Sequence, residues 1–167
     1  MAGLTAPADN HTSEGRVIEA DGWFPGIDTA AIRAAIRLGD GAIGDERLAA
    51  AIEGGIIAGL RALSAWRSAR AAEGIPDLAD VAPEDQVNGK PRAVLIWQRI
   101  VGFYTAAELA DTHLDVSATD EALDRDSEKR DAADDYRRKA FEAVADLQGI
   151  GLAEGAPAPG RNRVALI

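Results

Sequence analysis

The stretch from Asp45 to Glu73 constrains the fold most, because it holds the longest uninterrupted helical pattern in a chain that is otherwise broken by glycine and proline. Asp45 is a candidate N-cap for this helix, and Gly74 is a candidate stop. A helix of this length spans roughly 43 Å at about 1.5 Å per residue, which suits the spine of an elongated subunit. Apolar and small residues recur in it at steps of three and four, and so lie on one stripe: Leu48, Ile52, Ile56, Gly59, Leu63 and Trp66.

Two glycines one turn apart, Gly55 and Gly59, interrupt this helical pattern with small residues. Each glycine costs roughly 1 kcal/mol relative to alanine inside a helix, so a compensating interaction is expected. Close helix-to-helix packing supplies one, either within the bundle or between subunits, and a simple kink is the alternative. We therefore predict that Gly55 and Gly59 are close-packing positions.

The charge balance limits the classes of partner. Eighteen Lys and Arg residues stand against 28 Asp and Glu residues, for a net charge of −10, so the average surface repels nucleic acid and anionic membranes. The absence of cysteine excludes disulfides and thiolate metal sites. The start of the chain lacks a signal-peptide pattern, and the apolar run from Gly54 to Leu60 is too short to span a bilayer. We expect a soluble protein that is not exported and binds no membrane.

The pattern along the chain predicts three parts. Residues 1–22 are small and polar and predict a flexible N-terminal tail, within which residues 16–20 favour one short strand. Residues 23–149 predict a helical bundle, and residues 150–167 predict an extended C-terminal arm. Inside the bundle, Asp28 is a candidate cap for a helix over residues 29–38. Residues 74–90 predict a structured connector with Leu78 and Val81 as packing anchors.

Two further helices complete the expected fold. The first begins at Pro91, runs to about His113 and is apolar on most sides, which predicts a central position beside the spine. The second runs from Asp120 to Gln148; its first half, to Asp135, is acidic and predicted to be solvated, whereas its second half carries a packing stripe. The fold class predicted is all-α, an elongated bundle of about four helices. The residues of that packing stripe are Tyr136, Ala140, Val144 and Leu147.

Motifs that carry chemistry are scarce. The segment from Asp111 to Asp115 offers three types of metal ligand, but alternate residues of a helix point in different directions and do not converge on one ion. The acids of the last helix lack the loop pattern of a calcium site, and they alternate with bases as in a solvated salt-bridge ladder. We predict no catalytic residues, no metal and no cofactor, and an enzyme is the least supported class.

One order of short motifs resembles a known family. Trp23-Phe24-Pro25-x-Ile27-Asp28 is followed by Leu48-x-x-Ala51-Ile52, by Trp66-Arg67 before Gly74, and by Leu78-Ala79-Asp80-Val81 with Asn88-Gly89. An alanine-rich helix that bears aromatic residues, a charged helix and the ending Arg163-Val164-x-x-Ile167 come after them. This order, from about residue 22 to the end, resembles the head completion proteins (GpL type) of tailed bacteriophages.

The resemblance implies a structural role at the head–tail junction of the virion. Copies of the chain would form a dodecameric ring under the portal protein, stabilise the DNA-filled head and present a docking face to the next neck or tail-terminator protein. DNA would be passing cargo, and the family brings no catalytic residues. A second hypothesis, from another class of protein, is a small acidic adaptor or regulatory domain that dimerises through the helix Asp45–Glu73. A third hypothesis is a metal-dependent hydrolase that uses the acids of the last helix.

The end of the sequence is the predicted interface with a partner. Glycine and proline between Gly151 and Gly160 exclude a helix and predict an extended tether. The residues after this tether are first basic and then apolar, a composition that favours docking on a sheet edge or in a groove of a partner. The alternative is that these residues fold back onto the helical bundle of their own chain. The residues assigned to this interface are Arg161, Arg163, Val164, Leu166 and Ile167.

Overall fold

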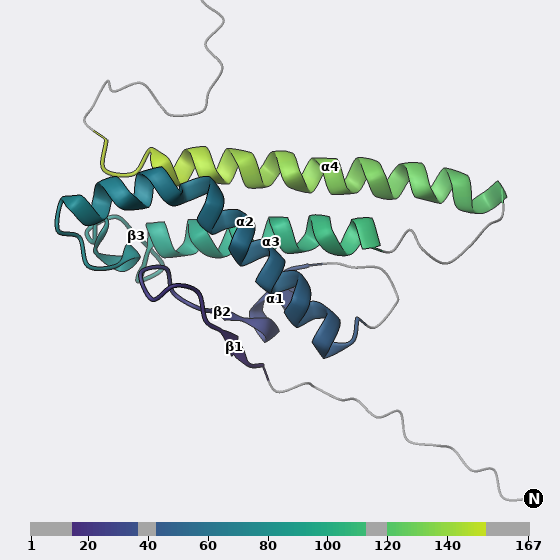
Figure 1. Cartoon of the computed structure of the whole chain (residues 1–167), viewed down its shortest axis with the longest axis horizontal. Helices are drawn as coiled ribbons and strands as arrows, with labels where there is room; N and C mark the ends of the chain where they lie inside the picture. The colour runs from purple at the N-terminus through teal and green to yellow at the C-terminus, as the bar shows by residue number, and fades with distance from the viewer. Residues whose placement is uncertain (1–14, 37–42, 113–119, 153–167) are drawn as a thin grey trace, which may run out of the picture.

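The computed structural model of the chain describes residues 15–36, 43–112 and 120–152, and it describes only the backbone of residues 120–129. This part of the chain is mostly helical, which confirms the predicted fold class. Figure 1 shows three long helices and one short helix, with small strand pairs beside them. The helices are α1 (Thr29–Ala35), α2 (Asp45–Ala72), α3 (Arg92–Thr112) and α4 (Asp120–Gln148); the other elements are β1 (Val17–Ile18), β2 (Ile27–Asp28), the 3-10 turn η1 (Leu78–Asp80), β3 (Gln86–Val87) and β4 (Lys90–Pro91).

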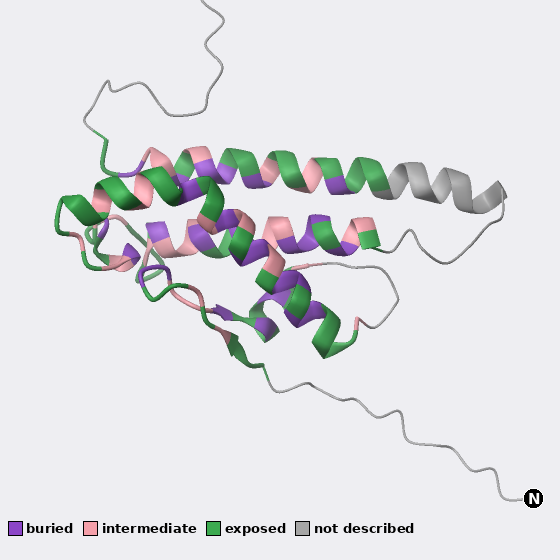
Figure 2. Ribbon diagram, viewed as in Figure 1, coloured by how far each residue is buried: buried purple, intermediate pink, exposed green. Residues whose placement is uncertain are grey.

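Helix α3 is the centre of the bundle, because it packs against both α2 and α4 whereas these two touch each other little. Its side chains Trp97, Ile100 and Val101 are fully buried, as the apolar composition of this segment predicts. Figure 2 shows the buried residues gathered on the faces where the three long helices meet. The helix starts at Arg92, one residue later than predicted, because Pro91 pairs with Gln86 in the antiparallel β3–β4 hairpin.

The other two long helices agree closely with their sequence patterns. The N-cap of α2 is Gly44, so Asp45 lies in the first turn and not at the cap. Gly74 follows the last turn with a φ of +85°, a conformation that glycine adopts without strain. Helix α4 has 29 residues and α2 has 28, so the spine is not the longest helix. The buried stripe of α4 contains Ala133, Ala140, Ala143, Val144 and Leu147, and Tyr136 is half-buried beside it.

By length and composition alone, α2 is apolar enough to cross a membrane, with a mean hydropathy of 1.4 over its best window. The helix as a whole is thus more apolar than the short run from Gly54 to Leu60 indicates. A core helix passes the same test, and 44% of this window is buried inside the fold. Burial inside the fold accounts for the apolar residues Leu48, Ile52, Ile56 and Leu63 of α2, whereas Ile57 is exposed.

An aromatic cluster joins the N-terminal segment to the long helices. The ring of Phe24 lies 4.3 Å from that of Trp97, and the indole Nε1 of Trp97 donates a hydrogen bond of 2.9 Å to the carbonyl oxygen of Pro25. The indole of Trp23 packs edge-on against Trp66 of α2, with ring centroids 5.8 Å apart. The turn at residues 23–25 therefore holds α2 and α3 together from one side.

Several boundaries differ from those predicted. Residues 15–22, assigned to the tail by the sequence, take part in the fold: β1 pairs antiparallel with β2, and Ile18 packs against the core. Helix α1 ends at Ala35 and not at residue 38. Ile150, assigned to the C-terminal arm, is buried in the core with only 4% exposure. The connector after α2 contains η1 and the hairpin, with Leu78 and Val81 buried as predicted.

Candidate functional site

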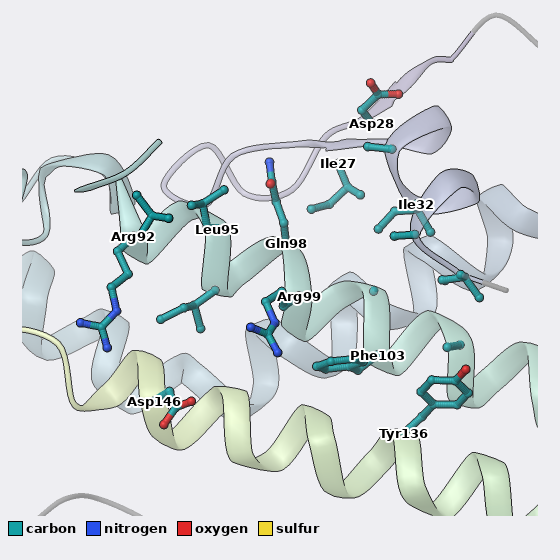
Figure 3. Close-up of a pocket in the computed structure, with 17 residues that line it drawn as sticks. Ile27, Asp28, Ile32, Arg92, Leu95, Gln98, Arg99, Phe103, Tyr136 and Asp146 are labelled. Atoms are coloured by element: carbon teal, nitrogen blue, oxygen red, sulfur yellow. The ribbon is translucent and has the colours of Figure 1, made fainter. Parts of the chain in front are cut away.

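An apolar groove of about 740 Å³ lies between α1, α3 and α4. Figure 3 shows Ile27 and Ile32 on one side of it, with Phe103 and Tyr136 on the other. Its apolar lining comes from β2, α1, β3, α3 and α4: Ile27, Ala31, Ile32, Ala35, Ile36, Val87, Leu95, Ile96, Gly102, Phe103, Ala106 and Tyr136. We call this hollow the α1–α3–α4 groove. Mostly apolar concave surfaces with a few polar groups are typical of binding sites.

Helix α3 has one face that is buried in the core and another face that lines the groove. Trp97, Ile100 and Val101 point into the core, whereas Leu95, Ile96 and Phe103 line the groove. The ring of Phe103 stacks on that of Tyr136 with a centroid distance of 6.5 Å and an interplanar angle of 29°, which links α3 to α4 along the groove wall. One helix thus serves both the core and a surface hollow.

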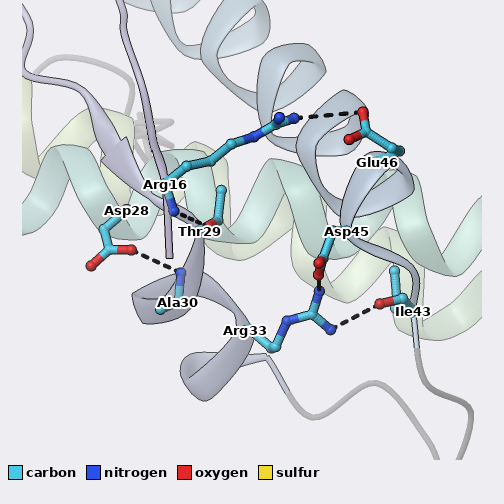
Figure 4. A network of polar contacts seen from close by, with 8 residues as sticks. All are labelled: Arg16, Asp28, Thr29, Ala30, Arg33, Ile43, Asp45 and Glu46. Carbon is cyan, nitrogen blue, oxygen red and sulfur yellow. Dashed lines mark hydrogen bonds and ion pairs between the residues drawn. The ribbon is translucent and has the colours of Figure 1, made fainter. Parts of the chain in front are cut away.

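Polar contacts fix the position of α1, which forms the opposite wall (Figure 4). The Asp28 carboxylate caps the helix by accepting a hydrogen bond of 2.8 Å from the backbone N–H of Ala30. The guanidinium of Arg33 donates to the carboxylate of Asp45 at 2.6 Å and to the carbonyl oxygen of Ile43 at 2.8 Å. These bonds tie α1 to the start of α2, so the width of the groove depends on them.

Four charged side chains line the groove: Asp28, Arg92, Arg99 and Asp146. Arg92 forms an ion pair of 2.8 Å with Asp85, so its charge is balanced locally. The guanidinium of Arg99 lies 5.6 Å above the ring of Phe103, in a cation–π contact. A smaller hollow of about 370 Å³ shares Arg99 and Asp146 with the groove and extends along α4 past Glu142.

The outer surface of α4 carries a ladder of ion pairs over residues 134–142. The side chains of residues 120–129, in the half where the sequence predicts such a ladder, lie outside the described ones. Hydrogen bonds from Lys139 and from Arg138 hold the pKa of the Asp135 carboxyl below its usual value. Arg138 also contacts Glu142 at 3.0 Å, one turn further along. Exposed pairs of this kind contribute little to stability individually.

The two glycines singled out in the sequence lie at the crossing of α2 and α3 within one chain. A Cβ atom at Gly55 would lie 2.7 Å from the hydroxyl oxygen of Thr105 and 2.9 Å from the carbonyl oxygen of Val101. A Cβ atom at Gly59 would lie 2.7 Å from the ring of Trp97. All three distances are shorter than side chains tolerate, so glycine allows this approach of the two helices.

Neighbouring Gly54 contacts a different kind of group. The Glu108 side chain covers Gly54, and burial raises the pKa of the Glu108 carboxyl, with a further contribution from the nearby charge of Asp111. Glu108 is nonetheless exposed, so its carboxylate end has room to move.

The remaining predicted sites divide between these elements and the undescribed residues. Arg161, Arg163, Val164, Leu166 and Ile167 lie outside the described residues. In the segment considered for metal binding, Asp111 forms an ion pair with Arg137 of α4, and His113 lies outside the described residues. Within residues 15–36, 43–112 and 130–152, no group of three or more potential ligands is placed to hold a metal ion. Sequence reasoning missed the α1–α3–α4 groove.

Comparison with curated proteins returns no match, and comparison with solved structures returns none either. The sequence model of one protein family does match, over residues 18–153, and that family is described as phage head completion protein (GPL). The match extends from β1 to just beyond the end of α4, and it confirms the resemblance seen in the order of motifs. The chain therefore belongs to the phage head completion protein (GPL) family, and it takes part in phage head assembly, in association with the virion and with other head or tail proteins.

Proposed function

We propose that this chain is a structural head-to-tail connector. Copies of it assemble as a ring, dodecameric by the resemblance, under the portal protein at the head–tail junction. The ring stabilises the DNA-filled head and presents a docking surface to the next neck or tail-terminator protein. The observation that carries this proposal is the family match over residues 18–153. Assembly takes place in the cytoplasm of the bacterial host.

The distribution of packing supports a connector. Gly55 and Gly59 let α2 and α3 pack closely, which gives each subunit a rigid half. The α1–α3–α4 groove lies on the other side of α3 and offers apolar surface to a partner. A subunit of a ring needs both properties, a body that keeps its shape and surfaces that neighbours recognise.

The charge of the chain is suited to DNA that passes through without being held. At a net charge of −10, the average field repels the phosphate backbone, whereas proteins that grip DNA neutralise phosphates with clustered Lys and Arg. We therefore propose that DNA is cargo in the channel and that the role is structural, without catalysis.

The arm, residues 150–167, is the proposed tether between subunits or between subunit and portal. Its candidate contact residues are Arg161, Arg163, Val164, Leu166 and Ile167, in which two bases precede apolar side chains. An acidic subunit attracts the bases, and the apolar side chains gain from burial in a groove.

The adaptor alternative placed dimerisation on the helix Asp45–Glu73, for which the two glycines offer one close-packing face. Thr105 and Trp97 of the same chain cover the two glycines, so that face is already used inside the subunit. This arrangement favours the connector over an adaptor that dimerises by glycine packing.

Electron microscopy of the purified chain mixed with its cognate portal protein tests the proposal. We expect a ring of extra density on the tail-facing side of the portal. A portal that remains bare at saturating concentrations of folded chain would refute the connector role, and a stable dimer that ignores the portal would favour the adaptor.

A further inference from the structure

We propose that the α1–α3–α4 groove receives the segment Arg161–Ile167 of a neighbouring copy of the chain. The inference rests on the proposed function in one respect, namely that copies stand side by side in an assembly. It adds the receiving site, the residues on both sides of the contact and the choice of a neighbouring subunit over the portal.

The length of the groove matches that of the segment. Along α3, the lining residues run from Arg92 to Ala106, which corresponds to roughly 21 Å at about 1.5 Å per residue. The segment Arg161–Ile167, when extended, covers roughly 23 Å at about 3.3 Å per residue. An extended chain of this length therefore fills the groove from end to end.

The alternation of side chains in the segment matches the two sides of the groove. In an extended chain Val164 and Leu166 lie on one face, and Arg161 and Arg163 lie on the other. The apolar pair suits the surface formed by residues such as Ile32, Leu95 and Phe103. The basic pair requires acids along one rim.

Helix α4 supplies these acids at the right spacing. Glu142 and Asp146 line the hollow that extends the groove, and they are one turn apart, about 6 Å along the helix. Arg161 and Arg163 are two residues apart, about 6.6 Å in an extended chain. Asp146 lies toward the Arg92 end of the groove, so pairing of Arg161 with Asp146 and of Arg163 with Glu142 fixes the register and directs Val164 and Leu166 toward Phe103.

The other charges of the groove leave room for this pairing. Arg92 is balanced by Asp85, and Lys139 is balanced by Asp135. Glu142 already contacts Arg138, but that contact is exposed and exchanges readily with another guanidinium. The guanidinium of Arg99 lies over the ring of Phe103.

The exit of the chain from α4 favours a neighbour's segment over the chain's own. A Cβ atom at Gly151 would lie 3.7 Å from the guanidinium of Arg70, so the backbone leaves beside α2. No residue of α2 lines the groove, since its walls come from α1, α3 and α4 with the β2 and β3–β4 segments. We therefore assign the groove to the segment of a neighbouring copy, which the proposed ring places beside it.

Disulfide trapping tests the contact cleanly, because the chain has no cysteine of its own. One full-length variant carries Gln98→Cys in the groove, and a second carries Leu166→Cys. After the two are mixed with the cognate portal protein and oxidised mildly, we expect cross-linked dimers at least about tenfold in excess over a control pair. The control replaces Gln98→Cys with Ile57→Cys, an exposed position of α2 outside the groove.

Charge exchange tests the register. Adding Asp146→Lys to the groove variant should reduce the cross-linked yield about tenfold, and adding Arg161→Asp to the other variant should restore it. Circular dichroism of each variant verifies that the helices are retained. Equal yields for all pairs, control included, would overturn the proposed contact.

The remaining outcomes separate this inference from the proposed function. A chain that joins the portal without the cross-link overturns the inference and leaves the connector role in place. A cross-link in concentrated chain that never joins the portal supports the inference and refutes the connector role. A Gln98→Cys/Leu166→Cys double variant that links only within one chain assigns the groove to its own segment and overturns the choice of a neighbour.

Discussion

Alanine should be tolerated less well at Gly55 than at the adjacent Gly54. Alanine gains roughly 1 kcal/mol over glycine inside a helix at either position. At Gly54 the new methyl group meets the flexible end of exposed Glu108, which can move aside, so most of that gain is kept. At Gly55 the methyl group meets the backbone of α3 at 2.9 Å and the hydroxyl of Thr105, which is fully buried and donates to the carbonyl of Val101.

Neither group at Gly55 can yield, so an overpacking cost of about 1–3 kcal/mol applies there and is absent at Gly54. Gly55→Ala should therefore be less stable than Gly54→Ala by that amount, a difference in Tm of roughly 2–12 °C for a chain of this size. Urea unfolding followed by circular dichroism measures both variants against the unmodified chain. Equal stabilities, or a more stable Gly55→Ala, would refute the account of the helix crossing, because the propensity gain is common to both.

Four other predictions test separate parts of the molecule. Gly59→Leu should lower the melting temperature, because the side chain would displace the buried ring of Trp97; an unchanged melting curve would contradict close packing there. Asp131→Asn should change the free energy of unfolding by no more than about 0.5 kcal/mol, since Asp131 is exposed; a larger loss in urea titration would show a missed contact. The pKa of the Glu108 carboxyl is higher in the folded chain than the ordinary value of about 4.3, so folding stability falls as the pH rises through the interval between these two pKa values. Glu108→Gln should therefore raise the melting temperature at pH 7 and not at acid pH. A chain that stops after Gly160 should keep its helical circular dichroism and nearly its melting temperature but fail to join a ring on the portal, and normal assembly would remove the arm from the interface.

The long helices were predictable because each carries its signal locally. The 3.6-residue period of α2 and α4 sets which faces are buried, and Gly74 and Gly149 mark where they end. The buried anchors Leu78 and Val81 were also accessible, since they are the large apolar residues of a polar connector. A helix can be predicted from the local sequence where one segment contains both the periodic apolar residues and the glycine that ends the helix.

The strand predicted over residues 16–20 contains β1, whereas the other strands and both strand pairings were missed because the strands are short. Two residues per strand carry no period, so β3 and β4 are marked only by the turn between them. Asn88 and Gly89 have φ values of +51° and +70°, the conformation of a type I′ hairpin turn, for which Asn-Gly is the strongest short signal. The dipeptide was therefore the one clue, and it also explains why Pro91 is in a strand and not in α3.

The α1–α3–α4 groove was beyond local reasoning. Nothing in the sequence around Leu95 or Phe103 distinguishes an apolar residue that is covered from one that lines an open hollow. The difference arises from the placement of α1, which depends on the contact of Arg33 with Asp45 across the undescribed residues 37–42. Sequence reasoning located an apolar central helix, and only the arrangement of its neighbours reveals which of its faces is free.

The two faces of α3 suggest how rigidity and recognition are combined in one helix. Toward α2, glycine and the buried Thr105 bring the backbones together, and a change there disturbs the core. Toward the groove, α1 is held at a distance by polar contacts at its ends, so apolar side chains such as Leu95 stay accessible. A partner that binds in the groove thus gains apolar contact without disturbing the α2–α3 crossing. Variants at the groove and variants at the glycines should therefore separate, the first affecting assembly with stability retained and the second affecting stability directly.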